Sequence, residues 1–278
     1  MMPTLTLLNK KQRALIVTIL AIVFLMIVIV IGVVLDKESI STNLKHRNAS
    51  PTFEHPFGTD WLGRDMFSRT FMGISLSIGV GLIGAFGSTL IATILGVISA
   101  TMGKTADRIV SWLIDLFLSV PHLVTLILIA FTFGGGFKGI VIGIALTHWP
   151  SLARIIRAEV MQIRSAEFVQ ISRKMGKSSW WIATKHIFPH ILPQILVGFM
   201  LLFPHAILHE AAVTFLGLGL SPHEPAIGII LSESMKYLSA GMWWLAFFPG
   251  LCLLFIVRTF DMLGENIRIL MDINIDHK

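Results

Sequence analysis

The sequence predicts an all-α polytopic membrane protein with six transmembrane helices, and three observations support this fold class. Hydrophobic residues make up 54% of the 278 residues, whereas charged residues make up only 14%. The mean hydropathy of +0.79 lies well outside the range of soluble globular domains. The basic residues collect in the gaps between long apolar runs. The net charge of +6 therefore indicates membrane orientation and not a nucleic-acid-binding patch.

The first predicted span covers residues 14–35, which contain no charged residue. This length is sufficient to cross about 30 Å of hydrocarbon. Basic residues precede it at positions 10, 11 and 13, so residues 1–13 are expected in the cytoplasm. A cleaved signal peptide is the alternative, but the run exceeds an apolar core of about 7–15 residues and lacks a small-residue cleavage site. We expect an uncleaved anchor helix.

Residues 36–69 are predicted to form an extracytoplasmic loop. They hold five acidic and five basic residues and are too short for a separate domain. The uncharged run at 70–103 follows as the second span. Small residues recur in it at every fourth position, and they are Gly84, Ser88, Ala92, Gly96 and Ala100. Such a row allows a second helix to approach closely in lipid, although glycines are also simply common in membrane helices.

The remaining predicted spans cover residues 109–133, 139–156, 190–216 and 242–257. We expect residues 70–265 to form a five-helix core, with a cytoplasmic tail at 266–278. Six spans place both termini in the cytoplasm, with fifteen Lys and Arg residues inside and seven outside. This partition agrees with the positive-inside rule.

A basic, polar insert interrupts the apolar sequence between the fourth and fifth spans. Seven of the twenty-two Lys and Arg residues lie between Arg154 and Lys185. We expect residues 159–192 to stand in the cytoplasm, with a two-turn helix at 167–175 that ends at Gly176. Pro189 and Pro193 are expected to mark the re-entry into the membrane. A membrane-surface amphipathic helix is the alternative to a docking element for a partner protein.

Three separated blocks resemble one family, the permease subunits of ATP-binding-cassette (ABC) importers for dipeptides, oligopeptides and nickel. The insert resembles the cytoplasmic EAA loop of these permeases, with Gln170-Ile171-Ser172 at the triplet position. The block HPFGTDWLGRDMFSR at 55–69 is similar to the extracytoplasmic signature of the C-type permease. The block EAAVTFLGLG at 210–219 is similar to the outer end of the fifth helix.

The resemblance implies the type I importer fold and a non-catalytic role. It implies that the insert couples the chain to an ATPase through Glu167, Gln170, Ile171, Ser172, Gly176 and Pro189. It also assigns the extracytoplasmic signature to Gly58, Asp60, Gly63, Arg64, Asp65 and Arg69. The expected partners are a second homologous permease, two ATPase subunits, an extracytoplasmic substrate-binding protein and membrane lipid. The expected location is the bacterial inner or plasma membrane.

No cofactor is expected on this chain, because it contains no phosphate-binding loop with Lys and Ser or Thr. ATP and Mg²⁺ would therefore bind the partner ATPases. The segment PHEPAIG at 222–228 departs from the family pattern, as does Ile273 after Asp272. The first departure leaves the cargo open.

Glu210 is predicted to lie within the fifth span, where an ionisable residue lines a transport path or makes a structural hydrogen bond. His205 and His209 precede it one turn apart and are predicted to line the same path. This spacing suits weak, transient metal ligation, although a packing role is the alternative for each histidine. Together with His223, they favour a nickel, cobalt, zinc or metal-chelate cargo over a dipeptide or oligopeptide.

Two other function classes compete with an importer subunit. A self-contained secondary transporter would contain inverted repeats, and it would leave the basic insert unexplained. An intramembrane protease would need a catalytic pair at helical depth, which the sequence lacks.

Overall fold

The computed structural model describes residues 9–271 and is helical, without named strands in that part of the chain. Most of the predicted segment 1–13 and the tail beyond 271 lie outside the described residues. The helices are α1 (Lys10–Val34), α2 (Met66–Thr101), α3 (Lys104–Ser119), α4 (His122–Thr132), α5 (Gly136–Thr147), α6 (Trp149–Ser165), α7 (Glu167–Lys174), α8 (Ser179–Ile182), η4 (Ala183–Ile187), α9 (Phe188–Phe215), α10 (Ile227–Leu238) and α11 (Trp244–Met271). Short 3₁₀ helices η2 (Lys37–Ile40) and η3 (Leu44–His46) lie between α1 and α2.

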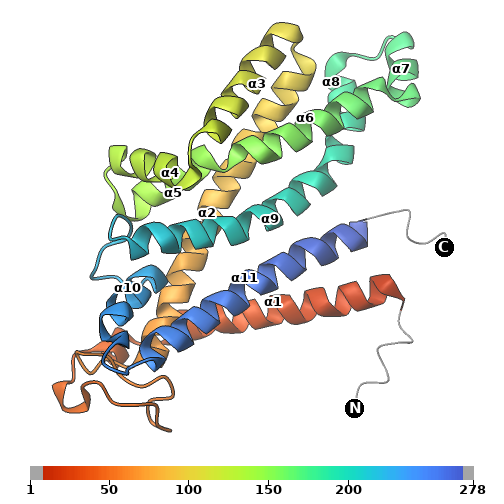
Figure 1. Ribbon diagram of the computed structural model, residues 1–278. Coiled ribbons are helices and arrows are strands. Elements are labelled where there is room, and N and C mark those ends of the chain that lie inside the picture. Colours follow the sequence, from red (N-terminus) through yellow and green to blue (C-terminus); the bar gives the residue numbers. More distant parts are fainter. Residues whose placement is uncertain (1–8, 272–278) are drawn as a thin grey trace.

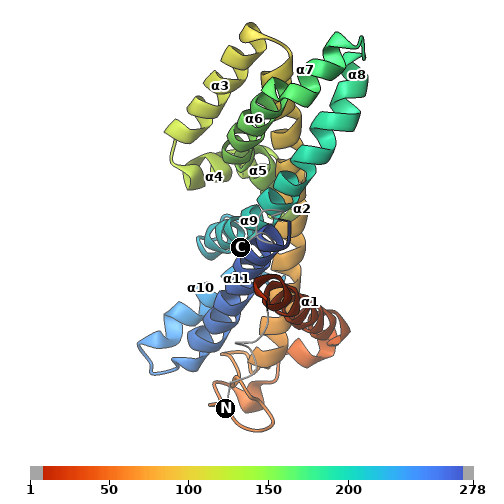
Figure 2. The ribbon, with the colours of Figure 1, turned by 90° about the vertical axis from the view of Figure 1, so that its right-hand side faces the viewer.

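The long helices α1, α6, α9 and α11 run side by side, and α2 crosses them obliquely (Figures 1 and 2). The first turn of α1, the last turn of α11 and the short helix α7 lie toward one end of the molecule (Figure 1). The segment between α1 and α2 lies at the opposite end with α10. The insert therefore lies at the same end of the molecule as the described ends of α1 and α11, and the predicted side of the membrane for the termini stays a prediction.

Within residues 9–271, five helical segments are long and apolar enough to cross a membrane, and a sixth arises if one bent pair is counted. The bent pair corrects the predicted straight span at 109–133, because α3 and α4 meet at 101°. Pro121 stands at the bend as the N-cap of α4. A proline has no N–H for the helical hydrogen-bond ladder and disfavours helical geometry in the residue before it, so α3 ends there.

The other spans are also longer than predicted. The fourth is Gly136–Ser165, the fifth is Ser179–Phe215 and the sixth is Trp244–Met271. Pro189 lies in the first turn of α9 and Pro193 inside it, so neither proline ends the helix, and re-entry into the membrane at these residues stays a prediction. The backbone N–H of Phe188 bonds to Ala183 O in the π-helical turn η4, which accommodates the missing proline donor within a continuous helix.

The row of small residues on α2 forms a helix–helix contact, as predicted. All five members are buried. A Cβ added to Gly84 would lie 2.7 Å from Ile144 Cγ2 on α5, and one added to Gly96 would lie 2.9 Å from Ala153 O on α6. The small side chains therefore let α5 and α6 pack directly on the α2 backbone.

Replacing Gly96 with Leu is expected to separate α2 from α6 and to destabilise the chain by about 1–3 kcal/mol through overpacking. Gly79→Leu, on the same helix, is the matched control, because a Cβ added to Gly79 would meet nothing within 4 Å. The measurement is the thermal unfolding midpoint in detergent. Equal midpoints for the two variants would contradict this packing.

Helix α10 is an element that the sequence analysis did not predict. It packs on α2, α9 and α11, and Ile227 and Ile230 are fully buried. Met66, Ile230 and Leu245 form a small core that joins α10 to the starts of α2 and α11. The segment at 222–228 that departs from the family pattern leads directly into this helix.

Candidate functional site

The polar insert folds into a hairpin at one end of the molecule. Helix α7 begins at Glu167 and is followed by Gly176, whose φ of +78° favours glycine and turns the chain toward α8. Val169 is fully buried and fixes α7 to the body. The predicted two-turn helix ending near Gly176 is confirmed in outline.

Large apolar side chains on this hairpin face outward. Ile171 is 57% exposed, Met175 72% and Trp180 78%. These exposed apolar side chains lie close to exposed basic residues. Such a surface is suited to binding another protein, because burying the apolar side chains in a partner removes them from water. We refer to Ile171, Met175 and Trp180 as the hairpin face.

The predicted coupling residues occupy different positions on this hairpin. Glu167 and Gln170 are exposed, and Gln170 Nε2 donates to Arg164 O at 2.8 Å. Ser172 Oγ lies 2.9 Å from His186 Nε2, and this contact ties α7 to η4. Pro189 lies in the first turn of α9, beyond the hairpin. The structure thus groups the first five predicted coupling residues and places Pro189 apart from them.

Polar contacts tie the hairpin to the membrane helices. Arg164, in the last turn of α6, donates to Ala100 O near the end of α2. Arg157 on α6 makes two hydrogen bonds to Asp107 on α3, of 2.5 and 2.7 Å. Ser99 of α2 donates to the same carboxylate at 2.6 Å. These contacts join α6, from which the hairpin continues, to α2 and α3.

The predicted extracytoplasmic signature builds a buried ion network. Asp60 Oδ2 accepts from Arg64 Nε at 2.7 Å and from Arg69 Nη1 at 2.6 Å. Glu233 on α10 accepts from both arginines, at 3.2 and 2.8 Å. Sequence analysis missed Glu233, because it stands 164 residues beyond Arg69 in an unrecognised helix. The network attaches the loop to α2 and α10.

The other signature residues shape the loop around this network. Asp65 caps α2 by accepting from the backbone N–H of Ser68 at 2.7 Å, and its second oxygen contacts His55. Gly58 and Gly63 both have φ of +72°. A Cβ at Gly58 would press on Ala49 O, and one at Gly63 would overlap Asn43 O. These residues therefore have structural roles in the described loop.

Glu210 is fully buried on α9. Its Oε1 accepts from Thr214 Oγ1 at 2.9 Å, whereas Oε2 has no hydrogen-bond partner among the described residues. Thr214 Oγ1 also accepts from the backbone N–H of Leu220 at 3.2 Å. This chain of contacts supports the structural alternative, in which Glu210 stabilises the turn after α9.

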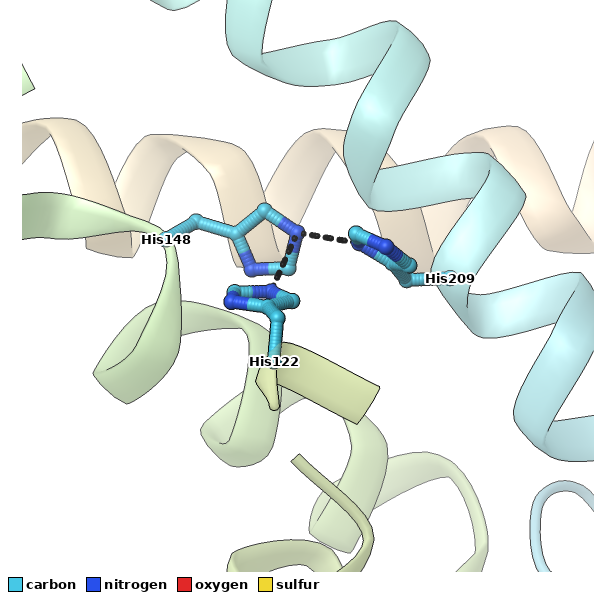
Figure 3. Close-up of side chains that lie close together, drawn as sticks. All are labelled: His122, His148 and His209. Atoms are coloured by element: carbon cyan, nitrogen blue, oxygen red, sulfur yellow. Dashed lines mark hydrogen bonds between the residues drawn. The ribbon is translucent and has the colours of Figure 1, made fainter. Parts of the chain in front are cut away.

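The histidines group differently from the prediction. His209 does not share a site with Glu210, and it meets His148 at the α5–α6 junction and His122 at the start of α4 (Figure 3). His148 Nε2 lies 2.9 Å from His209 Nδ1 and 3.3 Å from His122 Nε2. His205 is exposed one turn before His209 and lies outside the three-histidine group. We refer to His122, His148 and His209 as the histidine cluster.

Sequence reasoning missed two members of this cluster because they are distant in sequence. His122 precedes His148 by 26 residues, and His148 precedes His209 by 61. The available signal was their position, with His122 directly after Pro121 at a helix start and His148 two residues before Pro150 at a helix junction.

The chain is similar to known permeases over most of its length. Residues 92–268 match the family described as "Binding-protein-dependent transport system inner membrane component". The "Dipeptide transport system permease protein DppC" of Bacillus subtilis (strain 168) is 31% identical over 264 residues, which cover 95% of this chain and 82% of that protein. The "Oligopeptide transport system permease protein OppC" of the same organism is 34% identical over 232 residues, covering 84% of this chain and 76% of that protein.

Solved structures share the fold at low sequence identity. An inward-facing structure of the MetNI methionine ABC transporter contains a chain with a TM-score of 0.61 and 18% identity, covering 74% of this chain and 98% of that one. A crystal structure of an amino acid ABC transporter with histidines contains a chain with a TM-score of 0.57 and 16% identity, covering 73% and 94%. These similarities support the importer-permease fold predicted from the sequence.

Proposed function

The chain belongs to the family of binding-protein-dependent transport system inner membrane components, which are the non-catalytic permease subunits of ABC importers, and we propose that its cargo is a short peptide. The observation that carries this proposal is the similarity to DppC over 95% of the chain. The family membership excludes a self-contained secondary transporter.

The metal or metal-chelate cargo that the histidines led us to expect has less support than the peptide alternative. The relatives are named for dipeptide and oligopeptide transport. Among the predicted path residues, Glu210 bonds to Thr214 and His205 stands outside the histidine cluster, so the described contacts do not join all three in one metal site. His205 on α9, outside the histidine cluster, is suited to donating a hydrogen bond to a peptide carboxylate or carbonyl.

In this proposal the chain acts with four kinds of partner. An extracytoplasmic binding protein delivers the peptide, and a second homologous permease completes the path. Two ATPase subunits hold ATP and Mg²⁺ and close on the hairpin face, and lipid surrounds the spans. ATPase closure moves the hairpin, and the contacts of Arg164 and Arg157 transmit the motion to α2 and α3.

The test of the cargo is uptake into vesicles that contain the whole importer with its binding protein. Radiolabelled di- and oligopeptides should accumulate in an ATP-dependent manner. Nickel, cobalt and zinc, with or without a chelator, should not accumulate above the level of an ATP-free control. Metal uptake without peptide uptake would overturn the peptide assignment.

The proposed orientation places the hairpin and both termini in the cytoplasm. In a Cys252-free background, a cysteine at Lys177 should react with a membrane-impermeant maleimide only after the cytoplasmic side is opened. A cysteine at Lys45, in the loop at the opposite end, should react in intact cells. Labelling of both positions from one side would refute this topology.

A further inference from the structure

We propose that the histidine cluster of His122, His148 and His209 binds one divalent transition-metal ion. The ligand atoms of the three rings all lie within 4.8 Å of one another. In a tetrahedral site with metal–nitrogen distances of about 2.0–2.1 Å, ligand nitrogens stand about 3.4 Å apart. The observed separations of 2.9 and 3.3 Å differ from that value by half an ångström or less. The third pair, His122 and His209, lies within 4.8 Å, so ring rotations that bring it to about 3.4 Å would admit an ion.

The hydrogen bonds of His148 fix which of its nitrogens is free to bind. Nδ1 lies 3.1 Å from the carbonyl oxygen of Ile144, which can only accept. Thr147 Oγ1, also 3.1 Å from Nδ1, donates its own proton to Gly143 O at 2.8 Å. Nδ1 of the neutral ring must therefore carry the proton, and Nε2 presents its lone pair to the cluster. A backbone acceptor on the opposite ring nitrogen is the usual outer-shell contact of a metal-ligating histidine.

Hydrogen bonding alone does not satisfy the arrangement around His148 Nε2. This atom has one in-plane lone pair, yet ring nitrogens of both His122 and His209 approach it (Figure 3). Only one N–H can lie along that lone pair, so the other nitrogen has no good partner within the cluster. A metal ion at the centre accepts a lone pair from each ring at once and removes this conflict.

The composition and position of the cluster define the class of ion. Three imidazoles without a carboxylate favour Zn²⁺, Ni²⁺, Co²⁺ or Cu²⁺ over Mg²⁺ or Ca²⁺, which prefer oxygen ligands. His148 is buried, while His122 and His209 are partly exposed, and water in the fourth position would complete a tetrahedral site. The ligands come from α4, the α5–α6 junction and α9. The ion would therefore cross-link three helical segments.

The experiment uses the purified importer, with all of its subunits, after treatment with a chelator. Zn²⁺, Ni²⁺ or Co²⁺ is added, and bound metal is measured by equilibrium dialysis with elemental analysis. We expect one ion per copy of this chain, a rise in thermal unfolding midpoint on binding, and visible Co²⁺ absorption without thiolate charge transfer. Metal binding in this assay does not depend on the identity of the cargo. A negative result in the peptide uptake assay would therefore contradict the proposed cargo and not the metal site, and absence of bound metal would contradict the metal site and not the cargo.

Three variants make the result specific. His148→Ala and, separately, His122→Ala should lower the affinity at least about 100-fold, because each removes a direct ligand, and outer-shell changes alone cost about 10- to 100-fold. His223→Ala, on an exposed loop histidine outside the cluster, should bind as the parent does. His122 is partly exposed at the start of α4. His122→Ala therefore tests the site if the importer with the buried His148→Ala substitution does not assemble. Absence of stoichiometric metal, or equal affinity in His122→Ala and His223→Ala, would overturn the proposal.

Discussion

Replacing Ile171 with Asp is expected to uncouple the ATPase subunits while the membrane helices stay folded. Ile171 is 57% exposed on α7, so the change leaves the core intact. In the assembled importer the same side chain would be buried in the partner, where an unpaired carboxylate is strongly unfavourable. Loss of a central apolar contact costs on the order of 2 kcal/mol or more, about a 30-fold weaker association.

The measurements are copurification of the ATPase subunits and substrate-stimulated ATP hydrolysis in vesicles, and both should fall. Gln162→Asp is the matched control, because it adds the same charge at an exposed position on α6. Gly176→Val tests the turn itself, since φ of +78° strains a β-branched residue. It should reduce coupling although a Cβ there meets nothing within 4 Å. Normal coupling in both Ile171→Asp and Gly176→Val would contradict the proposed role of the hairpin.

Hydropathy predicted the membrane helices well, because the cost of burying charge in lipid acts on every residue of a span. Hydropathy did not predict a bend between two helices that lie within one apolar run. Residues 109–133 are apolar on both sides of Pro121, so composition alone did not separate α3 from α4. Helix α10 was missed for the opposite reason. Its buried isoleucines occupy the first turn, Ser, Glu and Lys follow them, and it is too short to form a span.

The candidate site was predictable where its residues are close in sequence. The turn at Gly176 and the end of α7 follow from local rules of helix termination. The histidine cluster does not, because its members come from three helical segments that only the tertiary fold brings together. Spacing within α9 suggested pairing His205 with His209, but residues on other helices compete for the same ring. In the structure the Nδ1 atom of His209 lies 2.9 Å from Nε2 of His148.

Replacing Arg69 with Met is expected to produce the largest loss of stability. Arg69 is 3% exposed and bridges Asp60 to Glu233, with hydrogen bonds of 2.6 and 2.8 Å. Its removal leaves two carboxylates to share Arg64. Breaking a buried ion pair by removing one partner costs about 3–5 kcal/mol, because the remaining charge is left uncompensated. At about 3 kcal/mol, the thermal unfolding midpoint of the purified importer should fall by about 6–12 °C.

Two further variants separate the charge imbalance from the loss of packing. The double variant Asp60→Asn/Arg69→Met leaves Arg64 opposite Glu233 as a balanced pair, and the introduced amide oxygen can still accept from the backbone N–H of Leu62. It should therefore recover part of the lost stability. Arg154→Met removes an ion pair whose side chains are 56% and 72% exposed, and it should cost less than about 1 kcal/mol. If Arg69→Met unfolds no earlier than Arg154→Met, the buried network does not hold the signature loop to α2 and α10.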